Sequence, residues 1–314
     1  MALDRLPLAT GIHLVGDFPL HGGCEIYQLC QAELGPRLLY YPDTRIVDGD
    51  DIRAWLAGAD GAARLSHRAR GSLDALEALK EAVALPAGIR ASLSILAPFK
   101  TSRFAKPEDR VEPDADSAYA AWLMDEVKRV VTDLPSSSTD LAVQIKLPFA
   151  DLAEATQGDT ADSAFADVLL DSVTSIIEAL PESIPVAVHM NCRDGAGFKI
   201  QPNDFADMTE LSNRLLERCV RRIDLLHIPV PLVVSDESFF APLRRLALRP
   251  ETRLCLGLIH LSDGVEGAMR RIALARTGFP EFALAARSGF ATREPAVIAD
   301  FLKLHADVAS ACES

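Results

Sequence analysis

Short apolar runs alternate with longer amphipathic stretches along this chain. A run of four to eight apolar, β-branched residues between turn signals is typical of a strand buried on both faces. Such runs predict strands over residues 11–16, 37–41, 89–96, 140–147, 184–190, 222–228, 253–260 and 281–287. Apolar spacing of three and four residues predicts helices over residues 24–34, 73–83, 115–131, 161–180, 204–219, 264–275 and 294–311.

This alternation is typical of a parallel sheet with a helix between consecutive strands. Eight such units in 314 residues predict an α/β fold, a single (β/α)8 TIM barrel over residues 1–314. The alternative is a doubly wound open sheet, which usually has a glycine-rich first turn, whereas this chain has DFPLHGG there. The polar segment 100–116 is long for a barrel connection, so we expect a loop at the mouth.

Histidines close three of the predicted strands, and a fourth lies within the first. These are His189, His227, His260 and, in the first strand, His13. Because the C-terminal ends of barrel strands face a common cavity, we expect the first three to converge there. A neutral imidazole serves as acid or base near pH 7, so His260, His227 and His189 are candidate catalytic residues. For each histidine alone, a buried structural role is an alternative.

Composition narrows the class of partner. The net charge of −13 disfavours nucleic acid and anionic membranes as partners. No stretch of about 18 uncharged apolar residues exists to span a bilayer. The six cysteines are scattered without a close pair, and the N-terminus has no signal-peptide pattern, so we expect a cytoplasmic protein with reduced thiols. Large barrels often pair through exterior helices, which favours a homodimer.

Several segments carry a resemblance to a known family. They are HLVGDFPL, PEDRVEPDADSAYAAWLMDEV, HIPVP, DESFFAPL and LGLIHLSDGVEGAMRRIALA. Together they resemble the C-terminal catalytic domain of cobalamin-independent methionine synthase, within the uroporphyrinogen decarboxylase-like barrel superfamily. The resemblance implies a zinc-containing (β/α)8 barrel that activates a thiol for alkylation.

The chain departs from this family at the implied zinc ligands. His189 is kept, but Asn191 stands where the family has cysteine, with Cys192 one residue further on. Pro229 falls at the acidic ligand and Ser288 at the last cysteine. Zinc needs three or four nitrogen, sulfur or oxygen ligands, for which asparagine and serine are poor substitutes. We therefore expect the family's zinc site to be absent.

Other positions at the mouth have changed from acidic to basic. They are Arg45, Lys146 and Arg287, and they favour a small anionic metabolite as the ligand. Asp17 replaces a small hydroxyl residue of the family and could orient His13 or His21, and Asp17 and His13 are further candidate binding residues. The alternative is a degenerate site whose charged groups are merely solvated.

The HLSDGVEG motif keeps its acidic residues. Asp263 is a candidate catalytic residue and Glu266 a candidate binding residue. Both also fit a structural interpretation, because Asp263 precedes a predicted helix that it would cap, with Glu266 completing a capping box.

Three functions remain open from the sequence. The first is an enzyme that acts on a small anionic, aromatic or pterin-like compound by histidine acid–base catalysis, as a transferase, lyase or hydrolase. The second is a zinc-dependent methyl or alkyl transferase, with the metal held by His189, Cys192 and His227. The third is a non-catalytic paralogue that binds a metabolite or an active subunit. No glycine-rich nucleotide motif is present, so the cofactor is unknown.

Overall fold

The computed structural model describes most of the chain. The described residues are 11–16, 18, 23–43, 65–85, 88–98, 114–133, 140–149, 160–194, 197–198, 203–234, 236–290 and 294–313. Two predicted binding residues, Asp17 and Arg45, lie outside them, as does most of the predicted mouth loop 100–116.

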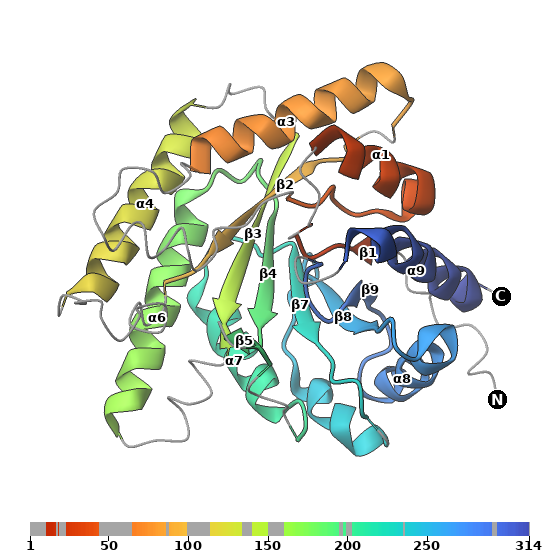
Figure 1. The fold of residues 1–314 in the computed structure, drawn as a ribbon. Coiled ribbons are helices and arrows are strands. Elements are labelled where there is room, and N and C mark those ends of the chain that lie inside the picture. Colours follow the sequence, from red (N-terminus) through yellow and green to blue (C-terminus); the bar gives the residue numbers. More distant parts are fainter. Residues whose placement is uncertain are drawn as a thin grey trace.

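A parallel sheet of seven strands forms the centre of the described structure (Figure 1). Its order is β1-β9-β8-β7-β4-β3-β2. The strands are β1 (Ile12–His13), β2 (Ala91–Leu96), β3 (Leu141–Pro148), β4 (Val186–Asn191), β7 (Leu225–Pro229), β8 (Arg253–Ile259) and β9 (Ala283–Ala286). A short antiparallel pair, β5 (Arg193–Asp194) and β6 (Gly197–Phe198), follows β4.

Helices alternate with these strands along the chain and lie around the outside of the sheet (Figure 1). They are α1 (Gly23–Leu34), α3 (Leu65–Ala82), α4 (Ala115–Asp133), α6 (Thr160–Ala179), α7 (Ala206–Arg218), α8 (Gly264–Gly278) and α9 (Ile298–Glu313), with 3-10 turns η1 (Gly35–Arg37), η3 (Glu237–Arg245) and η4 (Pro295–Val297). Helix α3 begins eight residues before its predicted start at 73, because Leu65 and Ala69 continue its buried face across Gly71.

The two edges of the sheet meet at the segment 38–41. Ile12 of β1 bridges Leu38, and Tyr41 bridges Ala91 of β2. The Leu39 amide donates to the Ile12 carbonyl at 2.9 Å. The predicted α/β class is therefore confirmed, with a curved, TIM-barrel-like parallel sheet. In the described residues this sheet has seven strands rather than the eight of the predicted (β/α)8 barrel. The predicted strand over 37–41 forms isolated bridges rather than a regular strand, since η1 ends at residue 37 and the chain bends at 39 and 40.

The strands bury side chains on both faces. Val188 and Leu226 belong to the large core between sheet and helices. On the other face, Ala187 and Leu225 pack in a small separate cluster with Cys255, Ala283 and Ala285. These mostly small residues fill the interior near the N-terminal ends of the strands. Gln144, His189 and His227 lie on the same face, and the two histidines lie further along their strands toward the C-terminal ends.

A buried arginine fixes the start of α8. Arg271 is 0% exposed and binds both carboxylate oxygens of Asp263, at 2.5 and 2.9 Å. It also donates to the carbonyls of Leu258 and Leu232, at 2.9 and 3.1 Å. A Cβ on Gly267 would lie 1.9 Å from Asp263 Oδ2, so the carboxylate needs a glycine there. Arg271 thereby ties β8 to the loop after β7 and to the entry into α8.

The predicted cap of α8 is wrong, because Asp263 is the N-cap residue but its side chain makes no capping hydrogen bond. Its carboxylate is bound by Arg271 instead, and Glu266 is exposed in the first turn. The motif's aspartate and last glycine thus have a structural explanation within α8 itself.

Replacement of Arg271 by methionine should lower the free energy of unfolding by about 3 kcal/mol, since it leaves Asp263 and two buried carbonyls without their donor. Arg270 provides a matched control: it is exposed and reaches Asp263 only at 3.5 Å. We expect Arg270→Met to cost at most about 0.5 kcal/mol. Urea denaturation followed by circular dichroism measures both, and equal losses would contradict the assignment.

Candidate active site

Two histidines from adjacent strands meet inside the sheet. His189 of β4 and His227 of β7 are paired in register, and their Nδ1 atoms lie 2.5 Å apart. The rings are stacked, with centroids 4.6 Å apart and planes 26° apart. Both residues are buried, and each lies two residues before the C-terminal end of its strand. The pair therefore lies near the C-terminal ends of the strands.

Lys146 extends the same row of side chains. It is paired in register with His189 and lies on β3, two residues before that strand ends. The lysine is 5% exposed, and its charge acts on both His189 and His13. Three neighbouring strands, β3, β4 and β7 (Figure 1), therefore present a lysine and two imidazoles at one height.

The surroundings of His227 indicate which ring nitrogen of each histidine in the pair carries the proton. A Cβ on Gly257 would lie 3.0 Å from the Ala286 carbonyl oxygen and 3.1 Å from His227 Nε2, so these two atoms are neighbours. The carbonyl favours a proton on Nε2, although the contact falls short of a standard hydrogen bond. His227 Nδ1 is then an acceptor, and His189 Nδ1 must donate to it. This leaves a lone pair on His189 Nε2.

The pair is neutral at physiological pH. Burial lowers the pKa of both His189 and His227 well below the usual value, and neighbouring His and Lys charges add to the effect. A neutral imidazole with a bare nitrogen is chemically a base, and it becomes an acid once it has accepted a proton.

His13 is held by a glutamine. Its Nε2 lies 2.6 Å from Gln144 Oε1, and Gln144 Nε2 donates to Ser94 Oγ at 3.1 Å. The His13 ring is 5.8 Å from that of His227. Because Gln144 Oε1 accepts, the proton is on Nε2, and Nδ1 is buried without a hydrogen-bond partner. Burial lowers the pKa of His13 to about 4.

Behind Gln144, a charged pair crosses the sheet to the outer helices. Asp43 Oδ2 accepts from the Ser94 amide at 2.8 Å and from Arg68 of α3. Arg68 also donates to the Ser94 carbonyl at 3.2 Å. Sequence reasoning missed Ser94, Gln144 and this pair. The available signal was the polar residues at every second position of β2 and β3, a period that puts them on one face.

A second group of polar side chains surrounds Arg287, just after β9. Burial raises the pKa of the Cys192 thiol to about 12, and the Arg287 charge opposes this only in part. Burial lowers the pKa of His260 to about 4, and the charges of Arg271 and Arg287 add to this. The structure joins His189 and His227 to His13 and places His260 within range of the charges of Arg287 and Arg271. The convergence of His260 with the histidine pair stays a prediction.

The residues present do not fit the zinc site that the family resemblance implies. His189 is engaged with His227, and Ser288 Oγ faces its neighbour's carbonyl at 3.5 Å. In the described part of the chain, no group of three or more His, Cys, Asp and Glu side chains is arranged to hold a metal ion. The set His189, Cys192 and His227 is therefore not assembled as ligands there.

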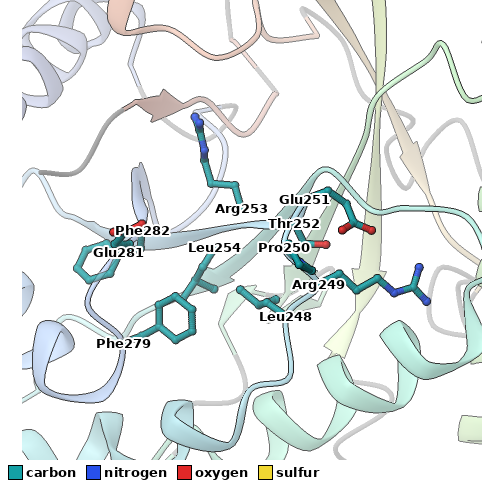
Figure 2. A pocket seen from close by; sticks show the side chains of 10 residues that line it. All are labelled: Leu248, Arg249, Pro250, Glu251, Thr252, Arg253, Leu254, Phe279, Glu281 and Phe282. Carbon is teal, nitrogen blue, oxygen red and sulfur yellow. The ribbon is translucent and has the colours of Figure 1, made fainter. Parts of the chain in front are cut away.

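A cavity of about 420 Å³ lies at the opposite ends of the strands (Figure 2). It is lined by residues 248–254 with Phe279, Glu281 and Phe282, where β8 and β9 begin. Its Arg249 is engaged with backbone carbonyls of Leu216 and Cys219, and its Thr252 with that of Ile223. These polar groups hold the chain together at the N-terminal face, away from the histidines.

Comparisons with known proteins were made by sequence and by structure. No family model and no curated protein matches the chain. A B12-independent methionine synthase from Shewanella sp. W3-18-1 in complex with selenomethionine aligns at 13% identity and a TM-score of 0.49, over 75% of this chain and 64% of that one. A putative vitamin-B12 independent methionine synthase from Listeria monocytogenes aligns at 18% identity and 0.46, over 71% and 64%.

A Schiff base forming fructose-1,6-bisphosphate aldolase aligns at 13% identity and a TM-score of 0.39, over 96% of this chain and 94% of that one. This chain thus spans 64% of the length of each of the two methionine synthases. At these identities and TM-scores, the likenesses carry no argument about activity, substrate or metal content. Among the described helices, none is long and apolar enough to cross a membrane.

The buried neutral histidines predict how stability depends on pH. His305 of α9 is the clearest case: it is buried against Phe301, outside the sheet interior, and burial lowers its pKa to about 4. The unfolded chain, with a histidine pKa of about 6.5, binds the proton first, so stability is lost as pH falls from about 6.5 toward 4.

For His305 alone, this loss should be about 2 kcal/mol between pH 8 and pH 5. Urea denaturation at both pH values measures the free energy of unfolding. Its decrease from pH 8 to pH 5 should be about 2 kcal/mol smaller in His305→Leu than in the unaltered protein. An unchanged difference between the two pH values would mean that His305 titrates normally in the folded state.

Proposed function

We propose that the protein is an enzyme that acts on a small anionic compound by histidine acid–base catalysis. In this proposal the seven strands and the segment 38–41 make up a complete (β/α)8 barrel, whose active site lies at the C-terminal ends of the strands. His189 is the base, His227 fixes its tautomer, and Lys146 supplies positive charge.

The contact between His189 and His227 carries this proposal. A hydrogen bond between two buried neutral imidazoles leaves one bare nitrogen in a dry environment, where a transferred proton is not lost to water. A purely structural interior would gain more from apolar residues, because buried polar groups are costly to leave incompletely bonded.

The anionic character of the substrate is inferred from charge. Lys146 and Arg287 lie near the strand ends of a chain whose net charge is −13. Cations at the bottom of a buried site attract anions more strongly than exposed cations do, because the low dielectric weakens screening. A zinc-dependent transferase gains no support from the described residues. Burial raises the pKa of the Cys192 thiol, and no group of three or more His, Cys, Asp and Glu side chains is arranged there to hold a metal ion. No described contact favours the non-catalytic paralogue.

Thermal-shift screening with small carboxylates and phosphorylated compounds, followed by turnover assays on the stabilising ones, tests the proposal. His189→Gln keeps a hydrogen-bonding side chain but removes the base, so turnover should fall about a hundredfold or more while ligand stabilisation persists. The matched control is His305→Gln, since His305 is equally buried and has a similarly lowered pKa outside the sheet interior.

His305→Gln should leave turnover per folded molecule unchanged. A substrate that the His189→Gln variant processes at the normal rate would refute the role of the histidine pair. Stabilising ligands without any turnover would favour the metabolite-binding paralogue instead.

A further inference from the structure

Lys146 has a different environment from the other lysines in the described part of the chain. Lys80, Lys128 and Lys303 have side chains 37%, 64% and 62% exposed, and each pairs with an acidic residue on the surface. Lys146 is 5% exposed and lies on the interior face of the sheet, at the height of the histidine pair.

We propose that Lys146 is a covalent catalytic residue, whose amine forms a Schiff base with the carbonyl carbon of a small anionic aldehyde or ketone. This inference rests on the proposed function, since the same site must admit the anion. It adds the class of substrate, a carbonyl compound, and a nucleophile for it.

The location supplies what imine formation requires. An amine removed from water gives up its proton more readily than an exposed one, and desolvation in an enclosed pocket is a known way to activate a lysine nucleophile. The charge of Lys146 acts on both His13 and His189, so two imidazoles lie within electrostatic range of it. His13 Nδ1 is buried without a hydrogen-bond partner. His189 is a buried residue, and by the tautomer argument its Nε2 carries the lone pair.

The reaction balances without an oxidant or a metal. A lysine ammonium first transfers a proton to a neutral imidazole, and His189 Nε2 is assigned this role. The amine lone pair then attacks the carbonyl carbon, and the electrons of the C=O π bond move to the oxygen. A proton passes from the attacking nitrogen to this oxygen, which gives a neutral carbinolamine. The imidazolium returns its proton to the departing hydroxyl, which leaves as water, and the products are one protonated imine and one water molecule.

Arg287 is a cation beside the histidine pair that the imine does not consume, since a Cβ on Gly257 would contact both its Cα and His227 Nε2. It lies close to Cys192 at the end of β4, the strand that carries His189. We assign to it the carboxylate or phosphate of the substrate, which matches the planar fork of a guanidinium.

Reductive trapping on the full chain tests the inference. The protein is incubated with sodium cyanoborohydride and either pyruvate or dihydroxyacetone phosphate, with uncharged dihydroxyacetone as the neutral control. Intact-mass measurement and peptide mapping then locate the adduct. We expect one adduct per chain on Lys146 with an anionic probe, formed at least about tenfold faster than on Lys80 in the same sample. Lys80 is an internal control, so the comparison does not depend on any variant.

Two variants separate this inference from the proposed function. Lys146→Arg keeps the positive charge but cannot form an imine, so it should abolish trapping while retaining stabilisation by anionic ligands. Lys80→Arg should leave trapping at Lys146 unchanged.

No adduct with either anionic probe, or equal labelling of Lys146 and Lys80, would overturn the Schiff base. If anions still stabilise the protein in that case, the proposed acid–base function stands without the covalent step. If they do not, the proposed function fails as well.

Discussion

The register of the parallel strands is the constraint on which the candidate site depends. Lys146, His189 and His227 come from three different strands and share one row because β3, β4 and β7 pair residue for residue. A slip of one residue in any strand would turn its polar side chain out toward the helices and bring an apolar one inside. Val188 and Leu226, the neighbours that would exchange places, are fully buried against the helices, so their burial opposes such a slip.

The imidazoles of the interior are buried and neutral, and one of them is held by a chain of hydrogen bonds. Gln144 holds His13, and Ser94 connects Gln144 to Asp43 and Arg68 in the outer layer. Such a chain restrains an imidazole without charging it, because its members adjacent to the ring are an amide and a hydroxyl. The ionised pair is kept further away, where its charges compensate each other. Each imidazole therefore keeps a lone pair on one nitrogen. A carboxylate partner would instead have favoured the imidazolium, in which both nitrogens carry a proton.

The HLSDGVEG motif shows that a sequence pattern with several candidate catalytic residues can instead stabilise the structure. Arg271 engages Asp263 and two carbonyls from separate loops, and Gly267 provides the space that the carboxylate needs. The histidine of the motif, His260, lies within range of these charges, which act on its pKa. A resemblance carried by this segment is consequently evidence for how α8 is attached, more than for which residues react.

The sequence alone determined the class of fold and most of the elements, because the periodicity of burial is a local property. Seven predicted strands appear at nearly their predicted places, and so do the helices. The exception, segment 38–41, forms only bridges because the turn before it and the bend within it interrupt regular pairing.

Which polar residues meet was decided only by the tertiary structure. In the sequence, all four histidines were identified by the same signal, an apolar run. This signal does not show how far along the strand a side chain lies or on which face of the sheet it lies. Strand register brings His13 to His189 and His227, and it places His260 near the charges of Arg271 and Arg287. The partners of His13 were likewise hidden, since Gln144 and Ser94 come from strands far apart in the sequence, and their hydrogen bonds exist only once β2 and β3 are paired.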